Sequence, residues 1–186
     1  MLVFCGSSSG HDPIFRRTAE DLGRAIAAAG AGLVYGGGDV GLMGAVASAT
    51  MEAGGEVTGV ITEQLQALEL AHGAITTLEV APDMHSRKAR MAELADGVVV
   101  LPGGFGTYDE TFEMLTWNQL GIVSTPLTFL DVAGFYGPLF EFIDGAVRAG
   151  FMKPDHGALA HRSTSATDAV AQALAVAAAF TPKWVG

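Results

Sequence analysis

The chain has 186 residues, a formal net charge of −10 and a single cysteine, Cys5. Its length predicts one domain, since typical domains hold roughly 100–200 residues. The negative charge argues against binding DNA or RNA, because such binding draws its affinity from Lys and Arg at the phosphates. A single cysteine excludes an intramolecular disulfide and suits a reducing compartment, and no apolar run is long enough to span a bilayer. We therefore expect a cytoplasmic protein with no nucleic-acid polymer and no membrane among its partners.

Short apolar runs alternate along the chain with longer segments that carry apolar residues at helical spacing. The runs predict strands at residues 2–5, 32–35, 56–61, 76–80, 97–101 and 126–130. The segments predict helices at residues 13–29, 42–53, 83–95, 107–120, 137–149 and 167–180. Most runs are unbroken rather than alternating, which is typical of strands covered on both faces. This order predicts an α/β fold with one doubly wound, mainly parallel sheet and helices on both faces.

Three residues predict where helices begin. Asp12 precedes Pro13, a pattern typical of an N-cap followed by a proline in the first helical turn. Asp83 and Thr107 open two later helices, and we expect them to be N-caps as well. In a doubly wound sheet the ligand binds beyond the carboxyl ends of the strands, so the site is expected there.

Turns of small residues follow three of the predicted strands and lead into helices. They read Gly-Ser-Ser-Ser-Gly at residues 6–10, Gly-Gly-Gly at residues 36–38 and Pro-Gly-Gly-Phe-Gly-Thr at residues 102–107. Glycine lets the backbone approach an anion, and the following helix points its free N–H groups at the same place. One such turn is equally explained as a tight turn, but three at one edge of a sheet indicate an anion site. The P-loop pattern G-x-x-x-x-G-K-[ST] does not occur in the sequence, which disfavours a P-loop ATPase.

Several charged residues fit both a structural and a functional interpretation. Arg87, Lys88 and Arg90 form either a solvated helix face or a basic group that pairs with a phosphate or a leaving base. Glu110 lies three residues after Thr107, which fits half of a capping box. It also fits a carboxylate beside a ribose, where it would stabilise the oxocarbenium character that develops when a glycosidic bond breaks.

On these residues the chain resembles the LOG family, whose members are cytokinin riboside 5′-monophosphate phosphoribohydrolases. Residues 102–110, Pro-Gly-Gly-Phe-Gly-Thr-Tyr-Asp-Glu, match the signature P-G-G-x-G-T-x-x-E. Residues 84–88, Met-His-Ser-Arg-Lys, match the second motif, M-H-x-R-K. Further matches at residues 35–38, 41–44, 96 and 117–121 extend the resemblance over nearly the whole chain.

The resemblance implies a Rossmann-like fold, a homodimer and action on nucleoside 5′-monophosphates, with a free base and ribose 5-phosphate as products. By motif match it implies that Arg87 and Glu110 are the catalytic pair. The resemblance also implies a set of substrate-binding residues: Gly37, Gly38, Glu69, Lys88, Gly103, Gly104, Phe105, Gly106, Thr107, Tyr108, Asp109 and Thr116. No cofactor is implied, and the five histidines lack the spacing of metal ligands.

The chain departs from the family pattern at positions that concern substrate preference. Thr62 stands where the family usually has proline, and Arg90 replaces a frequent acidic residue. Residues 123–125, Val-Ser-Thr, stand where a His and a Lys are common. The sequence leaves open whether AMP or an N6-prenylated AMP is the substrate.

Two alternatives remain at the level of the sequence. The first is a non-catalytic carrier or sensor of a nucleotide-like ligand, similar to the Rossmann-like molybdenum cofactor carriers. Such a carrier needs the glycine turns but not Arg87 and Glu110 together. The other alternative is an interaction module that uses the apolar helix predicted at residues 167–180 as its partner surface.

Overall fold

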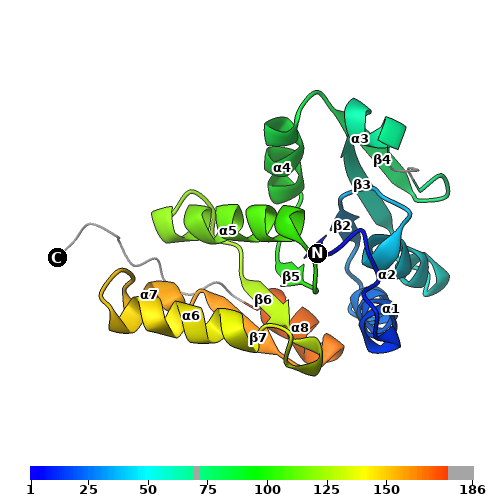
Figure 1. Ribbon diagram of the computed structural model, residues 1–186. Helices are drawn as coiled ribbons and strands as arrows, with labels where there is room; N and C mark the ends of the chain where they lie inside the picture. Colours follow the sequence, from blue (N-terminus) through cyan, green and yellow to red (C-terminus); the bar gives the residue numbers. More distant parts are fainter. Residues whose placement is uncertain (69–71, 176–186) are drawn as a thin grey trace.

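The computed structural model describes residues 1–68 and 72–175, and Figure 1 shows their arrangement. Within these ranges seven parallel strands form one sheet in the order β4-β3-β2-β1-β5-β6-β7. The strands are β1 (Leu2–Phe4), β2 (Leu33–Tyr35), β3 (Val57–Thr62), β4 (Thr77–Ala81), β5 (Val98–Val100), β6 (Leu127–Leu130) and β7 (Ala160–Ser163). The first six begin and end within one residue of the predicted runs, which confirms the predicted parallel α/β fold.

The edge strand β7 is the one that the sequence does not predict. It pairs only with β6, and of its four residues only Ser163 is buried. His161 and Arg162 face solvent, so the strand lacks the apolar run by which the other strands are recognised.

Helices join the strands in the order that the periodicity predicts. They are α1 (Pro13–Ala28), α2 (Gly41–Glu52), α3 (Glu63–Leu68), α4 (Met84–Glu93), α5 (Phe105–Leu120), α6 (Gly137–Arg148), α7 (Pro154–Gly157) and α8 (Ala166–Ala173), with a 3₁₀ turn at η1 (Val132–Gly134). The short elements α3, α7 and η1 are additional to the prediction. The predicted helix at residues 167–180 overlaps α8, and its part beyond residue 175 lies outside the described residues. None of the helices in the described ranges is long and apolar enough to cross a membrane.

Two of the three predicted N-caps are confirmed. The Asp12 carboxylate accepts a hydrogen bond from the backbone N–H of Ile14 at 2.9 Å, and the Asp83 carboxylate accepts one from Ser86 at 2.7 Å. The third prediction is wrong, because α5 begins at Phe105 with Gly104 as its N-cap, so Thr107 lies inside the first turn. The tight turn after β5 brings the chain into helical geometry two residues earlier than the threonine suggested.

Both faces of the sheet are covered, which confirms the doubly wound prediction. Along β1, Val3 belongs to one buried cluster and Leu2 and Phe4 to the other. The cluster with Val3 contains side chains of α1, α2 and α8, whereas that with Leu2 contains side chains of α4, α5 and α6. Figure 1 shows α4 standing over the N-terminal half of α5 on this second face.

The strand order reverses between β1 and β5. From β1 the chain adds β2, β3 and β4 outward on one side, and then returns to place β5 against the other side of β1. The turns after β1 and β5 therefore open next to each other at the carboxyl edge of the sheet. In doubly wound folds this reversal is where ligands bind.

Candidate active site

The three predicted glycine turns meet at the reversal of strand order. The backbone N–H of Gly6 donates to the carbonyl of Pro102 at 3.0 Å, which joins the turns after β1 and β5. The N–H of Leu42 donates to the carbonyl of Gly6 at 3.1 Å, which brings in the start of α2. Gly41 has φ +64°, and a Cβ there would lie 2.3 Å from the carbonyl carbon of Ser7. Only glycine permits this approach, so the convergence is built into the sequence.

The turn after β5 is tight on one side and open on the other. A Cβ at Gly103 would lie 2.1 Å from the Thr107 hydroxyl oxygen and 2.9 Å from the backbone nitrogen of Gly6. A Cβ at Gly104 or Gly106 would meet no atom within 4 Å. Gly104 provides no side-chain cap for α5, so the first N–H groups of the helix stay available to an anion.

Arg87 and Glu110 form a buried ion pair beneath these turns. Nη1 of Arg87 lies 3.1 Å from Oε1 of Glu110, and the two side chains are only 8% and 12% exposed. The remaining nitrogens of the guanidinium donate to backbone carbonyls: Nε to Val60 at 2.8 Å and Nη2 to Gly36 at 3.3 Å. Arg87 is thereby fixed to β3 and to the turn after β2, and it orients the carboxylate that comes from α5.

Burial makes the carboxylate of Glu110 unusual. Burial raises the pKa of the Glu110 carboxyl, and the guanidinium of Arg87 opposes this rise only in part. Oε1 accepts the hydrogen bond from Arg87, while Oε2 has no hydrogen-bond partner among the residues that the structure describes. A carboxylate with a shifted pKa and an unused oxygen at a ligand-binding edge is a candidate for a chemical role.

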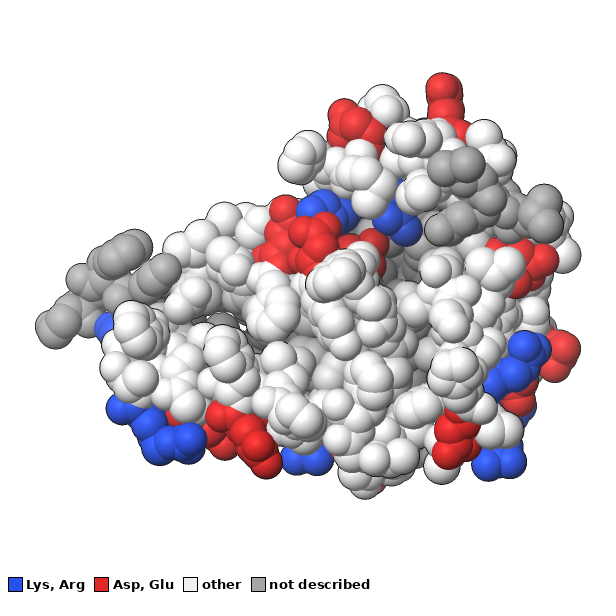
Figure 2. Space-filling view, in the orientation of Figure 1, with Lys and Arg blue, Asp and Glu red and all other residues white. Residues whose placement is uncertain are grey.

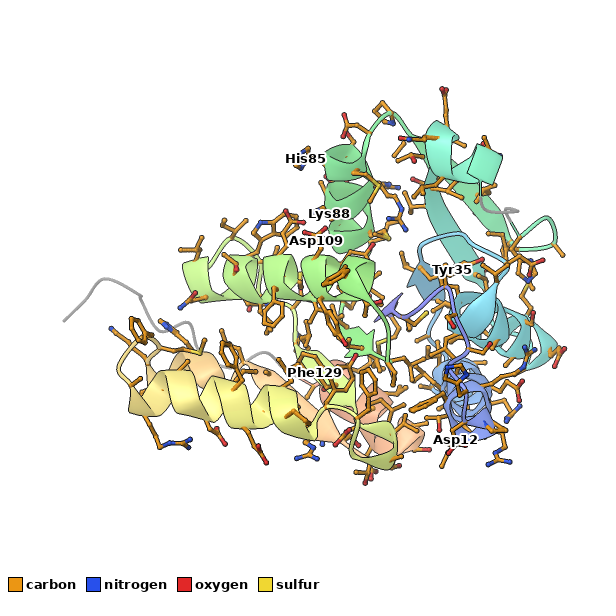
Figure 3. All side chains as sticks on the ribbon, viewed as in Figure 1. Asp12, Tyr35, His85, Lys88, Asp109 and Phe129 are labelled. Carbon is orange, nitrogen blue, oxygen red and sulfur yellow. The ribbon has the colours of Figure 1, made fainter. Side chains whose placement is uncertain are left out.

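Lys88, the neighbour of Arg87, also bridges α4 and α5. Its ammonium lies 3.0 Å from Oδ2 of Asp109 and 2.9 Å from Oε2 of Glu113. Figure 3 shows Lys88 reaching from α4 toward Asp109, and Figure 2 shows acidic atoms gathered beside basic ones where these helices meet. Burial alone would lower the pKa of Lys88, but the carboxylates of Glu113 and Asp109 outweigh it and raise the pKa. Lys88 is therefore a firmly held cation.

Beside the ion pairs lies a small hollow open to one side. It is lined by Phe4, Lys88, Glu110, Glu113, Met114 and Trp117. Its lining combines apolar side chains of β1 and α5 with charged side chains of α4 and α5. Glu110 thus lines this hollow and also pairs with Arg87.

The structure decides between the two readings left open for the charged residues. Arg87 is 6% exposed and the Lys88 side chain 11%, so a solvated helix face is wrong for these two. Arg90 does lie on the solvated side, where it pairs with Glu79. The capping box is also wrong, because Thr107 is not the cap and Glu110 bonds to Arg87.

The other residues proposed for substrate binding are placed unevenly. Gly37 and Gly38 are buried in the turn after β2. Phe105, which follows the turn after β5, is 93% exposed. Tyr108 packs against the core on the side of α5. Thr116 is exposed two turns further along, and its hydroxyl bonds within its own helix to the carbonyl of Phe112. Glu69 lies outside the described residues.

Some contributors to the site are missed by sequence reasoning. The carbonyls of Val60 and Gly36 hold Arg87, and no pattern in the sequence marks a backbone acceptor. Glu113 holds Lys88, and its only signal is its position four residues after Asp109 on the same helix face. Among the residues that the structure describes, no group of three or more His, Cys, Asp or Glu is placed to hold a metal ion.

Fold and site together define a class of protein: a Rossmann-like α/β protein with a buried arginine–carboxylate pair at the carboxyl edge of its sheet. Residues 43–173 match a family described as "Possible lysine decarboxylase". The chain is 48% identical over 153 residues to the "Cytokinin riboside 5′-monophosphate phosphoribohydrolase" of Rhodococcoides fascians, covering 82% of this chain and 77% of that one. A relative of the same name from Arabidopsis thaliana is 47% identical over 152 residues, covering 82% and 70%. The chain belongs to this family.

Solved structures show the same fold at low sequence identity. The molybdenum cofactor carrier protein of Chlamydomonas reinhardtii superimposes with a TM-score of 0.69 at 22% identity, covering 91% of this chain and 92% of that one. The molybdenum cofactor binding protein of Rippkaea orientalis gives a TM-score of 0.69 at 19% identity over the same shares. At this level of identity the likeness concerns the fold alone.

Proposed function

We propose that the chain hydrolyses the N-glycosidic bond of a nucleoside 5′-monophosphate and releases a free base and ribose 5-phosphate. The observation that carries the proposal is the buried pair of Arg87 and Glu110, 3.1 Å apart where three glycine turns meet. The family relatives are named as cytokinin riboside 5′-monophosphate phosphoribohydrolases, so adenine or an N6-substituted adenine is the proposed base. Water is the second reactant, and the reaction needs no cofactor.

The turns after β2 and β5 are the proposed site of the phosphate. Gly104 and Gly106 leave open space in front of the first N–H groups of α5, and the helix dipole favours a negative charge there. Gly37 has φ +80° and holds the turn after β2 close to β3. Backbone donors of this kind bind a phosphate without adding a positive side chain, in agreement with the acidic character of the chain.

Glu110 is the proposed catalytic carboxylate. As the bond between the ribose and the base breaks, positive charge develops at the anomeric carbon of the sugar. Glu110 lines the hollow, and its carboxylate, when ionised, stabilises that charge or orients the attacking water through the oxygen that Arg87 does not contact. The carboxylate does this best in a site from which most of the water is excluded, as its burial indicates.

Arg87 is the proposed partner of this carboxylate. It fixes Glu110 in place, and its charge favours the ionised form of that residue. Its contact with the carbonyl of Gly36 also brings the guanidinium to the edge of the proposed phosphate site. From there the N–H groups that remain unused can neutralise the phosphate or support the departing base.

We further propose that the chain forms a homodimer through the outer face of α5. Phe112 and Leu120 lie on this face and Ile122 follows it, and they are 41%, 41% and 64% exposed. Thr116 lies four residues after Phe112 and four before Leu120, so this proposed substrate-binding residue is on the same face of α5. Light scattering should give a dimer for the unaltered chain and a monomer for L120D. F142D is the control, because Phe142 is 71% exposed on α6.

The free buried thiol of Cys5 suits a reducing compartment such as the cytoplasm.

A panel of substrates tests the proposed activity. Purified protein is incubated with AMP, N6-prenyl-AMP, other nucleoside monophosphates and adenosine, and free base is separated by chromatography. Release from the monophosphates but not from adenosine is expected, because the glycine turns bind the phosphate. A non-catalytic carrier would bind AMP tightly and return it unchanged, and that result would exclude the hydrolase.

A further inference from the structure

The carboxylates of α5 outnumber the cations that face them from α4. Glu113 lies four residues after Asp109 and three residues after Glu110, and side chains at these spacings are neighbours on a helix. From α4 only Arg87 and Lys88 reach them. Two cations must therefore serve three carboxylates, and the way in which they are shared fixes the charge around Glu110.

The structure shows an unequal division of these cations. Arg87 pairs with Glu110 alone, whereas Lys88 pairs with Asp109 at 3.0 Å and with Glu113 at 2.9 Å. The Lys88 ammonium makes no ion pair with Glu110 in the described part of the chain, although both line the same hollow. Glu113 is the less exposed of its two partners, at 27% against 59% for Asp109, so it is the firmer anchor.

We propose that Glu113 is a positioning residue, which holds the ammonium of Lys88 away from the carboxylate of Glu110. The inference rests on the proposed function, in which Glu110 is the carboxylate that faces the ribose. Without Glu113, Lys88 keeps only the exposed Asp109 as a partner, and its flexible side chain is free to turn toward Glu110 across the hollow. A second cation on Glu110 would occupy the oxygen that the sugar needs.

Glu110 meets few other charged or titratable groups that could mask this effect. From α4 it faces Arg87 and Lys88, and from its own helix Asp109 and Glu113. Directly after β1, Cys5 brings a thiol near Glu110, and burial, together with the charge of Glu110, raises the pKa of that thiol so that it stays protonated. Arg87 is held in place by two backbone carbonyls, so Lys88 is the cation beside Glu110 whose position can change.

The test follows the titration of Glu110 itself. Protein labelled with ¹³C at the glutamate carboxyl carbons is titrated by NMR, and E110Q identifies the resonance. In E113Q the midpoint of the Glu110 titration should move to lower pH, since an approaching cation favours the ionised form. In E93Q, which removes an exposed carboxylate that pairs with Arg90 at the far end of α4, it should stay in place. An unchanged midpoint in E113Q overturns the proposal.

A second comparison separates the action through Lys88 from a direct action of Glu113. In a K88M background, E113Q should shift the Glu110 midpoint less than it does in the presence of Lys88. Equal shifts in the two backgrounds would mean that Glu113 acts on Glu110 directly, which contradicts the proposal. Since the titration needs no turnover, failure of this inference is distinguishable from failure of the proposed hydrolase activity.

Discussion

In the part of the chain that the structure describes, two arginine–carboxylate pairs have a buried acid, and they differ in how many oxygens of that acid accept a hydrogen bond. At the far edge of the sheet, Oδ2 of Asp131 accepts hydrogen bonds from Nε and Nη2 of Arg162, and Oδ1 accepts one from the backbone N–H of Tyr136. The guanidinium of Arg162 also lies over the ring of Phe140, 5.3 Å from its centre. Every strong acceptor site of Asp131 has a partner, and the pair fastens β7 and η1 to the sheet.

The pair of Arg87 and Glu110 is arranged in the opposite way. Three N–H groups of its arginine donate to two carbonyls and one carboxylate oxygen, and its acid keeps an oxygen without a hydrogen-bond partner among the described residues. It also lies at the reversal of strand order, whereas Asp131 follows β6, nearer the edge. In the structural pair both carboxylate oxygens accept hydrogen bonds, whereas in the pair proposed to act in catalysis one carboxylate oxygen stays available to a ligand.

The largest expected effect is the loss of activity in E110Q. Glutamine keeps an acceptor for Arg87 but carries no charge to stabilise the sugar cation, so base release from AMP should fall about 10³-fold. The free energy of unfolding should change by no more than about 2 kcal/mol. Chromatography of free adenine and urea unfolding measure the two quantities, with E93Q as an exposed control. An E110A variant that retains full base release would falsify the catalytic role.

D131A should show the reverse pattern. Removing the carboxylate leaves the buried Tyr136 N–H and Arg162 without an acceptor, so the free energy of unfolding should fall by about 3 kcal/mol. Activity per folded molecule should stay within about twofold at a temperature below the transition. Urea unfolding checks the prediction, with D144A on the exposed side of α6 as control. A large loss of kcat/KM in folded D131A would abolish the distinction between the two pairs.

Two neighbouring glycines sharpen the comparison at the proposed phosphate turn. In G103A the new methyl group meets the Thr107 side chain and the backbone of Gly6, which should cost about 2 kcal/mol of stability. In G104A it meets open space, and the φ of −107° suits alanine, so stability should be unchanged. Affinity for ribose 5-phosphate should fall in both variants. Thermal unfolding measures the stability of the two variants, and calorimetry measures their affinity for ribose 5-phosphate. Equal stabilities of G103A and G104A would contradict the close packing described for Gly103.

The smallest expected effect is a displacement of the pH profile. Burial raises the pKa of Glu110, so the acid limb of kcat/KM should lie above the range of an ordinary glutamate, because the ionised form is the active one. The same shift favours the folded state at low pH, and this contribution is lost as the pH rises through the raised pKa. The stability of the unaltered chain relative to E110Q should therefore fall over that interval. An acid limb at the ordinary value of a glutamate would contradict this assignment.

Much of the fold could be predicted because its strands are buried on both faces. The strand β5 consists of three valines, and Asp12 and Asp83 mark helix starts by their side-chain chemistry. The edge strand β7 was not predicted, because its residues are mostly not buried and therefore do not form an apolar run. Thr107 was misread because the close packing of Gly103, and not a side-chain cap, decides where α5 begins.

The candidate site could be predicted as residues but not as geometry. The motifs name Arg87 and Glu110, which the fold brings together from two helices 23 residues apart in sequence. The carbonyls that hold Arg87 come from β3 and the turn after β2, and the sequence carries no sign of them. The sharing of Lys88 between Asp109 and Glu113 depends on how closely α4 approaches α5, which only the packed structure determines.

The identity of the products formed from AMP tests the central claim most directly. The carboxylate of Glu110, held by Arg87 beside a phosphate turn, acts on the bond between the sugar and the base. The account therefore predicts adenine and ribose 5-phosphate in equal amounts, formed by the unaltered chain and lost in E110Q. Adenosine and inorganic phosphate as products, or AMP recovered intact from a tight complex, would contradict it.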